Sequence, residues 1–368
     1  MKQKTERDSN LELLRIVAMI FIVLHHFIVH GCQLAELNSR HPTIFPKNDF
    51  TLSAILLTCN AFFIVGVNVF ILISGYYSIK IKWKTVFSLL AVCLFYDYAQ
   101  MYVSDLLTSD HFEWHFGPVY RIFIRSGWFI TCYMALMFLS PILNKAIDHF
   151  SDREKIYVLL GLCLLNLWFG FHLRADLIND TGYKLMQFIF IYYIGRCLNN
   201  FEDRIKWNVF KSIAGYIVCS LVLAGIVLYY FHEKQFKDLW IQFNYNNPLV
   251  VLSSVFLFWT FRNLQIRSKI VNWCSSSVLA VYLIHESPFV GGVLYPFIIK
   301  THKKYGFFSF EDTAILFVLF LVIMVGSILV DKIRVIITNP MVSWSSRKAE
   351  KIQCLIEERA FDRDGAIK

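Results

Sequence analysis

NLELLRIVAMIFIVLHHFIVHG, residues 10–31, is the stretch that decides the fold. It is long and apolar enough to cross a bilayer as one helix, which takes about 20 such residues. It nevertheless carries ionisable side chains, which are expensive at membrane depth and therefore usually face a cavity and serve a function. The stretch predicts a first membrane helix that is polar along one stripe and apolar elsewhere. Its ionisable residues are Glu12, Arg15, His25, His26 and His30.

Helical spacing places Arg15 and His26 on the same stripe. At about 100° and 1.5 Å per residue, they differ by about 20° in azimuth and about 16 Å along the axis. Glu12 and His30 each lie about 60° from Arg15 on the same side, whereas His25 points about 80° off the stripe. We therefore expect His26, rather than His25, to face a functional cavity. A histidine satisfied inside the helix bundle is the structural alternative.

The composition of the whole chain is typical of an integral membrane protein. Of its 368 residues, 57% are hydrophobic and 17% aromatic, whereas soluble domains are typically about 45–50% apolar. The net charge of +9 comes from short cationic clusters between apolar runs, which argues against a nucleic-acid partner. The nine cysteines form no CxxC pair and no zinc-like spacing, so we expect neither a disulfide framework nor a metal site.

The apolar runs predict an all-α, polytopic helix bundle with about ten transmembrane helices in the cytoplasmic membrane. Lys and Arg outside these helices concentrate on the side of the two termini, so the positive-inside rule predicts that both termini are cytoplasmic. We expect residues 1–335 to form the membrane domain and residues 336–368 a charged cytoplasmic tail. The ninth span is long enough to contain a break near Pro288. The expected spans are 11–31, 51–79, 85–107, 126–147, 156–173, 183–198, 208–231, 247–262, 271–299 and 312–330.

The first helix also carries a resemblance to a known family. A pattern LR-x-x-A, an apolar run and then HH, at the start of a multi-spanning protein, resembles the membrane acyltransferase-3 family. Members of that family O-acylate cell-surface glycans from acyl-CoA. The family's Arg, followed eleven residues later by His, falls here on Arg15 and His26, which the resemblance implies are the catalytic pair. His25 stands where the family often has an aromatic or small residue.

Residues 74–84, SGYYSIKIKWK, resemble a second landmark of the family. Many members have an Arg-x-x-Arg motif nearby, whereas this chain has three lysines, which are point charges rather than bidentate forks. The resemblance implies a cytoplasmic grip on the phosphates of CoA, with ordinary positive-inside topology as the alternative. The glycine would let the backbone approach a ligand closely. The expected donor-binding residues are Arg15, Ser74, Gly75, Lys80, Lys82 and Lys84.

Two further segments resemble later landmarks of the family. Trp128, at the start of WFITCYMALMFLSP, either covers a substrate or anchors its helix at the membrane interface. In SSSVLAVYLIHESP, residues 275–288, His285 and Glu286 lie in an otherwise apolar run and therefore need a buried partner. Tyr282 is three residues before His285 and shares its helical face. A structural polar network is the alternative to a site. The expected supporting residues are Glu12, His25, Trp128, Tyr282 and His285.

The resemblance to this family implies an O-acyltransferase of the stand-alone form, which consists of the membrane domain without the additional domain that some members carry. His26 would act as general base on a sugar hydroxyl or as an acyl relay, and Glu12 would pair with Arg15. The donor would be cytoplasmic acyl-CoA, with acetyl the expected group and no permanently bound cofactor. The acceptor would be exported polysaccharide or a lipid-linked sugar of the cell envelope. A polytopic transporter of a glycan or anion, and a sensor without catalysis, are the competing hypotheses.

Overall fold

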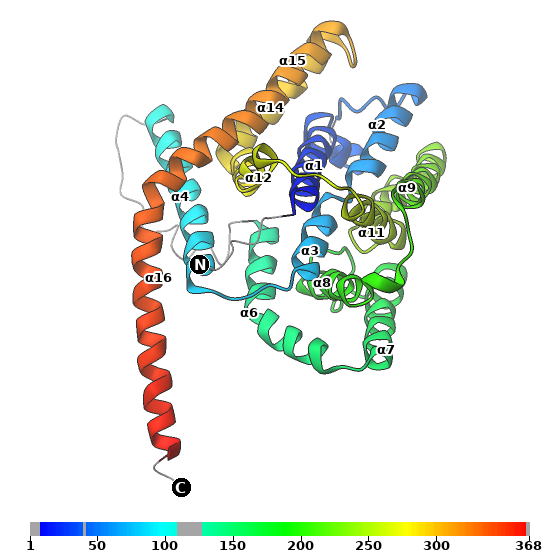
Figure 1. Cartoon of the computed structure of the whole chain (residues 1–368). Helices are drawn as coiled ribbons and strands as arrows, with labels where there is room; N and C mark the ends of the chain where they lie inside the picture. Colours follow the sequence, from blue (N-terminus) through cyan, green and yellow to red (C-terminus); the bar gives the residue numbers. More distant parts are fainter. Residues whose placement is uncertain (1–7, 40–41, 109–126, 366–368) are drawn as a thin grey trace.

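The computed structural model describes residues 8–39, 42–108 and 127–365, and these form helices and turns without a strand (Figure 1). The first elements are α1 (Ser9–His26), η1 (Phe27–Gly31), η2 (Leu34–Asn38), α2 (Phe50–Phe63), α3 (Gly66–Tyr76), α4 (Trp83–Thr108), α6 (Trp128–His149), α7 (Asp152–Cys163), η3 (Leu164–His172) and α8 (Leu185–Asn200). The remaining elements are η4 (Glu202–Arg204), α9 (Val209–His232), α10 (Phe236–Gln242), α11 (Pro248–Arg262), α12 (Lys269–Ser275), α13 (Val278–His285), α14 (Pro288–Tyr305), α15 (Phe310–Leu321), η5 (Val322–Gly326) and α16 (Ser327–Gly365).

Seven helices of the described segments are long and apolar enough to cross a membrane, so the chain is a multi-span helical protein. A bent pair, α12–α13 with α14, would make an eighth span. The expected count of about ten is not confirmed, because α8 and α11 have only 16 and 15 residues, fewer than the about 20 that a bilayer takes. The seven are Ser9–Gly31, Phe50–Tyr76, Trp83–Leu107, Trp128–His149, Asp152–His172, Val209–His232 and Phe310–Ile356.

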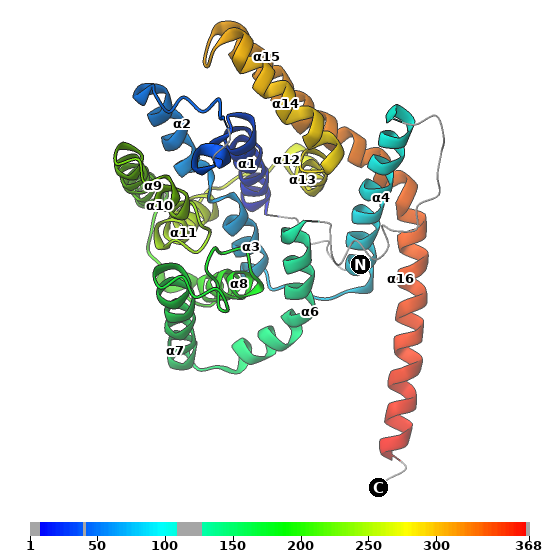
Figure 2. The ribbon, with the colours of Figure 1, turned by 180° about the vertical axis from the view of Figure 1, so that it is seen from behind.

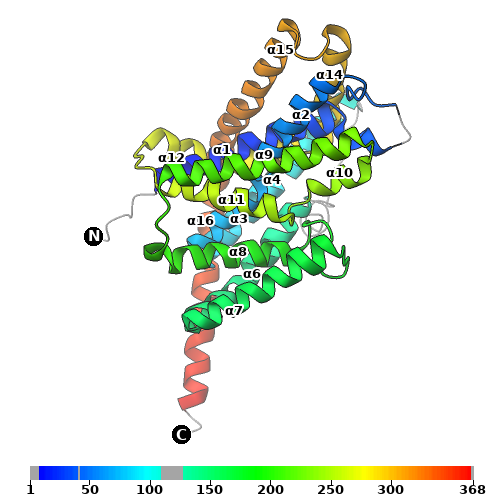
Figure 3. The same ribbon diagram turned by 90° about the vertical axis from the view of Figure 1, so that its right-hand side faces the viewer.

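Helix α1 occupies the centre of the bundle, where it contacts α2, α3, α11, α12 and α13. On one side, α3 packs on α8 and α9 packs on α11; on the other, α4 packs along α16 (Figures 1 and 2). The far half of α16 runs past the other helices (Figure 3). The expected domain boundary at residue 335 lies inside α16 and stays a prediction.

The crossing of α3 and α8 depends on two glycines. A Cβ atom added to Gly75 would lie 2.3 Å from the carbonyl oxygen of Tyr192, and one added to Gly195 would lie 2.5 Å from that of Leu72. Such distances are far below van der Waals contact, so only glycine allows the two backbones to approach this closely. The close approach that was expected at Gly75 is therefore made by helix α8.

The segment from α12 to α14 is interrupted twice. Ser276 and Ser277 separate α12 from α13, and Glu286 and Ser287 separate α13 from α14 at a bend of 77°. Pro288 explains the second break, because proline lacks an N–H and disfavours helical backbone at the residue before it. The expected break near Pro288 is thereby confirmed. Non-helical backbone at membrane depth is tolerated where it is buried in protein or lines a cavity.

The end of α1 widens into a π-helical turn, η1, immediately after His26. The backbone N–H of Cys32 closes this turn with a hydrogen bond of 2.8 Å to the carbonyl oxygen of Phe27. Single π-turns inside helices occur frequently at functional sites. The π-helical turn is therefore consistent with a functional site on α1 near His26.

Candidate active site

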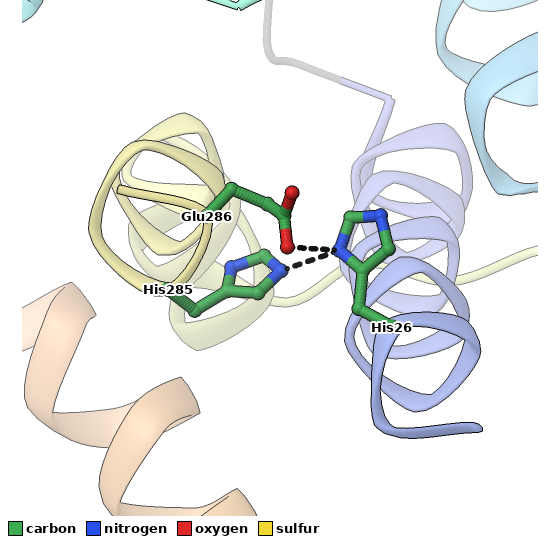
Figure 4. Close-up of side chains that lie close together, drawn as sticks. All are labelled: His26, His285 and Glu286. Carbon is green, nitrogen blue, oxygen red and sulfur yellow. Dashed lines mark hydrogen bonds and ion pairs between the residues drawn. The ribbon is translucent and has the colours of Figure 1, made fainter. Parts of the chain in front are cut away.

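Three side chains converge where α1 meets the break between α13 and α14 (Figure 4). The Nδ1 atom of His26 lies 2.9 Å from Nε2 of His285 and 3.0 Å from Oε1 of Glu286. All three are shielded, since the side chains of His26 and Glu286 are only 13% and 26% exposed and His285 is fully buried. Two segments about 260 positions apart in the chain thus form one polar cluster at membrane depth.

The hydrogen bonds of this cluster fix the tautomer of His26. The Nδ1 atom of His285 lies 2.6 Å from the carbonyl oxygen of Val281, so it must donate, and the Nε2 of a neutral His285 must accept. His26 therefore carries its proton on Nδ1, in reach of both His285 and Glu286. Its Nε2 atom then has a free lone pair, and in Figure 4 this second ring nitrogen points away from both partners. A histidine held in this form is a ready general base.

Glu286 is the residue that sequence reasoning left out of the site. Its carboxylate accepts a hydrogen bond from the hydroxyl of Tyr295, which lies about two turns into α14. The same carboxylate contacts Nδ1 of His26, so it would stabilise the imidazolium that forms when Nε2 takes up a proton. Its place directly after His285, in an apolar run that ends in Ser-Pro, was the available signal. Nothing in the sequence indicated that its partner would be His26 on α1.

His26 and Glu286 open on a cavity of about 230 Å³. One wall is aromatic, and the rings of Trp128 and Tyr245 stack there with centroids 5.5 Å apart. The structure therefore brings Trp128 and Tyr282 to the cavity, whereas His285 lies behind its wall and contacts His26. Sequence reasoning missed Asp97 and Gln100 of α4, which line the same cavity. The lining residues that matter for chemistry are His26, Asp97, Gln100, Trp128, Tyr245, Tyr282 and Glu286.

His25 points elsewhere, as its azimuth predicts. Its Nδ1 atom lies 2.6 Å from Oδ1 of Asn60 on α2, and the histidine is only 7% exposed. This pair joins α1 to α2. His25 is therefore a packing and hydrogen-bonding residue in this structure, and it does not line the cavity of about 230 Å³.

Arg15 and Glu12 form the expected ion pair one turn from the start of α1. Glu12 also accepts a hydrogen bond of 2.5 Å from the hydroxyl of Ser275 on α12. Neither residue lines the cavity at His26. The charge of Arg15 is thus neutralised by Glu12, its neighbour on α1, and not by a residue of the cavity at His26.

A second cavity of about 510 Å³ lies beside the first, and Leu279 lines both. We call it the cationic cavity, after Lys82, Lys84 and Arg334 in its wall. Asp331 also lines it and pairs with Arg334 at 2.7 Å. Lys80 is exposed and does not line it. Two of the three expected lysines therefore face a space that adjoins the cluster at His26.

Ser74 and Gly75 do not line the cationic cavity either. The hydroxyl of Ser74 donates to the carbonyl oxygen of Phe70 at 2.9 Å and lies 3.2 Å from the hydroxyl of Tyr133, which does line it. Gly75 faces α8. Any contact of these two residues with a donor would therefore be indirect in this structure.

The ligand atoms of His26, His285 and Glu286 all lie within 4.8 Å of one another, which is close enough to hold a metal ion. The proton on Nδ1 of His26 lies within reach of both Nε2 of His285 and Oε1 of Glu286, so hydrogen bonding accounts for the close approach of these three atoms. We therefore treat the cluster as a hydrogen-bonded network.

Comparison with known proteins places this cluster in a family. The model of the acyltransferase-3 family, an acyltransferase domain, matches residues 8–332. No curated protein and no solved structure matches the chain. The matched region includes the whole of α1 and the break at Glu286, and it covers most of the 368 residues. The contact of His26 with His285 and Glu286 thus lies within the domain of a multi-span membrane acyltransferase, and the chain belongs to the acyltransferase-3 family.

Proposed function

We propose that this protein is an O-acyltransferase that moves an acyl group, acetyl being the expected one, from cytoplasmic acyl-CoA to a hydroxyl of a cell-surface or exported glycan. The family supports acyl transfer. The observation that carries the proposal is the contact of Nδ1 of His26 with both His285 and Glu286, which assigns the proton of a neutral His26 to Nδ1 and leaves Nε2 to accept one.

Sugar hydroxyls are weak nucleophiles at neutral pH, so the reaction needs a base. Nε2 of His26 takes the hydroxyl proton while the sugar oxygen attacks the thioester carbonyl. The tetrahedral intermediate then expels the thiolate of CoA, which recovers the proton from Nε2 of His26. Glu286 stabilises the imidazolium between these steps. The runner-up is an acyl relay, in which Nε2 itself attacks the thioester and passes the acyl group to the sugar.

The two adjoining cavities suit the two ends of the donor. The cations of the cationic cavity attract the phosphates of CoA, while its thioester reaches the cavity at His26. Arg15 remains a proposed donor-binding residue near the start of α1. The aromatic wall of Trp128, Tyr245 and Tyr282 offers flat faces with polar tips for an acceptor, either polysaccharide or lipid-linked sugar.

The direct test uses purified protein in lipid vesicles with labelled acetyl-CoA and candidate glycans. Label on the glycan, with release of CoA that depends on the acceptor, supports the enzyme. Movement of glycan across the vesicle membrane without consumption of CoA supports the transporter instead.

The lysines of the cationic cavity should act on donor binding. Replacing Lys82 and Lys84 together by Gln is expected to raise the KM for acyl-CoA about three- to tenfold and to change kcat little, because exposed charges contribute uniform attraction of modest size. Steady-state kinetics at low and high salt measure this effect, which salt should weaken. Lys80→Gln is the matched control. An equal rise in KM for the control would mean that general surface charge, and not the cavity, binds the phosphates.

We also propose that both termini are cytoplasmic. Reporter tags fused to the N- and C-termini should then report the cytoplasm, and a tag within residues 32–50 should report the outside. Cells that carry each fusion in the cytoplasmic membrane provide the measurement. A C-terminal tag on the outside would show an odd number of spans, as seven candidate helices would give, and would reject the proposed placement.

A further inference from the structure

The first interruption of the α12–α14 segment leaves one buried hydroxyl without a partner. Ser277, between α12 and α13, is 1% exposed, and its Oγ makes no hydrogen bond with the described residues. Its two neighbours differ, since Ser275 donates to Glu12 and Ser276 donates to the carbonyl oxygen of Trp273 at 2.8 Å. A buried hydroxyl without a partner costs free energy, and such groups in folded proteins call for an explanation.

The position of Ser277 supplies that explanation. It lines the cationic cavity, and Leu279, two residues further, lines both that cavity and the one at His26. We call these two residues the threshold. On one side of the threshold stand Lys82 and Lys84, and on the other stands His26. Leu279 is the residue that the two cavities share, and Ser277 lies two residues before it in the wall of the cationic cavity, so both lie on a direct route from the cations to the histidine.

The chemistry of the walls describes such a ligand. It needs an anionic end for the cations, an uncharged arm that can hydrogen-bond to one hydroxyl, and a reactive end at His26. A thioester carried by a nucleotide through an amide-bearing arm has these three parts in this order. Break residues at membrane depth are tolerated where they line a cavity, and both interruptions of this segment do so.

Building on the proposed function, we propose that the amide-bearing arm of the donor lies across the threshold, with an amide hydrogen-bonded to Oγ of Ser277 and Leu279 packed against the arm. Ser277 and Leu279 thereby select donors whose acyl group is carried on a thin, amide-bearing arm. The two residues bind and position the donor and take no part in proton transfer.

Occupancy of the threshold can be measured without catalysis. In the full chain with Leu279→Cys, alkylation of the new thiol by N-ethylmaleimide is followed by peptide mass spectrometry, with and without desulfo-CoA, which keeps the arm but lacks the thiol. Saturating desulfo-CoA should slow alkylation at residue 279 about tenfold or more. The native Cys59, which lines a separate groove on α2, is the internal control, and its rate should not change. Equal rates at residue 279 with and without desulfo-CoA would overturn the proposal.

Kinetics of Ser277→Ala provide the second measurement. One hydrogen bond to a neutral amide contributes about 0.5–1.5 kcal/mol, so the KM for acetyl-CoA should rise about three- to tenfold with little change in kcat. Ser254→Ala is the matched control, because Ser254 is also buried but donates to the carbonyl oxygen of Val250 within α11 and lines neither cavity. An unchanged KM for Ser277→Ala would overturn the role of its hydroxyl.

Failure of this inference differs from failure of the proposed function. If the wild-type protein transfers acyl groups but residue 279 is not protected, the donor takes another route and the proposed function stands. If the wild-type protein transfers no acyl group from any donor while desulfo-CoA protects residue 279, the proposed function fails and the binding route is supported.

Discussion

Replacement of His26 by Ala is expected to abolish acyl transfer, with a loss of about 10²–10⁴-fold in kcat, the usual contribution of a general base. The reason is local: among the described residues that line this cavity, His26 is the one that offers an imidazole nitrogen, and its Nε2 makes no contact with His285 or Glu286. His26→Gln should be equally inactive, because an amide hydrogen-bonds but does not take up the proton. Initial rates with labelled acetyl-CoA, normalised to the amount of folded protein in the membrane, give the measurement.

His25→Ala is the matched control for this experiment. It removes the partner of the buried Asn60, and leaving such a group unpaired costs about 1–3 kcal/mol of stability. The variant should therefore unfold at lower temperature but keep much of its activity per folded molecule. If His25→Ala were the dead variant and His26→Ala active, the assignment of the base would be wrong. If both variants stayed active, the histidines would have a structural role, and the hypothesis that the protein is a transporter would be favoured over the enzyme.

Glu286→Gln is expected to lower kcat about 10²-fold, because removal of one electrostatic stabiliser of a transition state typically costs about 10²–10³-fold. Glutamine keeps the size of the side chain and an oxygen that can accept from His26, so the geometry is preserved while the negative charge is lost. The KM for the donor should change little, since Glu286 acts on the imidazolium that forms during the reaction. Saturation kinetics in both substrates separate these effects.

Tyr295→Phe is the control for Glu286. It removes the hydroxyl that donates to the carboxylate but leaves the charge, so its effect on kcat should be clearly smaller. A kcat for Glu286→Gln equal to that of the wild type would show that the imidazolium needs no counter-charge, and would favour a role for Glu286 in folding alone.

Local helical geometry explains what the sequence could predict. The azimuth of a residue on a helix depends only on its position, so the sequence predicted that His25 and His26 point in directions about 100° apart. The same rule predicted the pair of Glu12 with Arg15. Proline chemistry is equally local, and it predicted the break near Pro288.

Contacts between distant segments explain what the sequence could not predict. Nothing in α1 indicates that Glu286 would be the partner of His26, because that contact depends on how two helices pack. The lysines at 80–84 precede or begin a helix after an extended connection, where no azimuth rule applies, so the exclusion of Lys80 from the cavity was not predictable. The cavities and the unpaired hydroxyl of Ser277 arise from packing as well.

The bend between α13 and α14 has a consequence for the electric field at His26. Each helix carries about half a unit of negative charge at its C-terminus and about half a unit of positive charge at its N-terminus, from the alignment of its peptide dipoles. An unbroken helix would keep these poles at the two membrane surfaces. Here the C-terminal pole of α13 and the N-terminal pole of α14 both end at the cavity, at Glu286, Ser287 and Pro288. The backbone itself therefore supplies a permanent dipolar field beside Glu286 and the cavity, which no change of pH can titrate away.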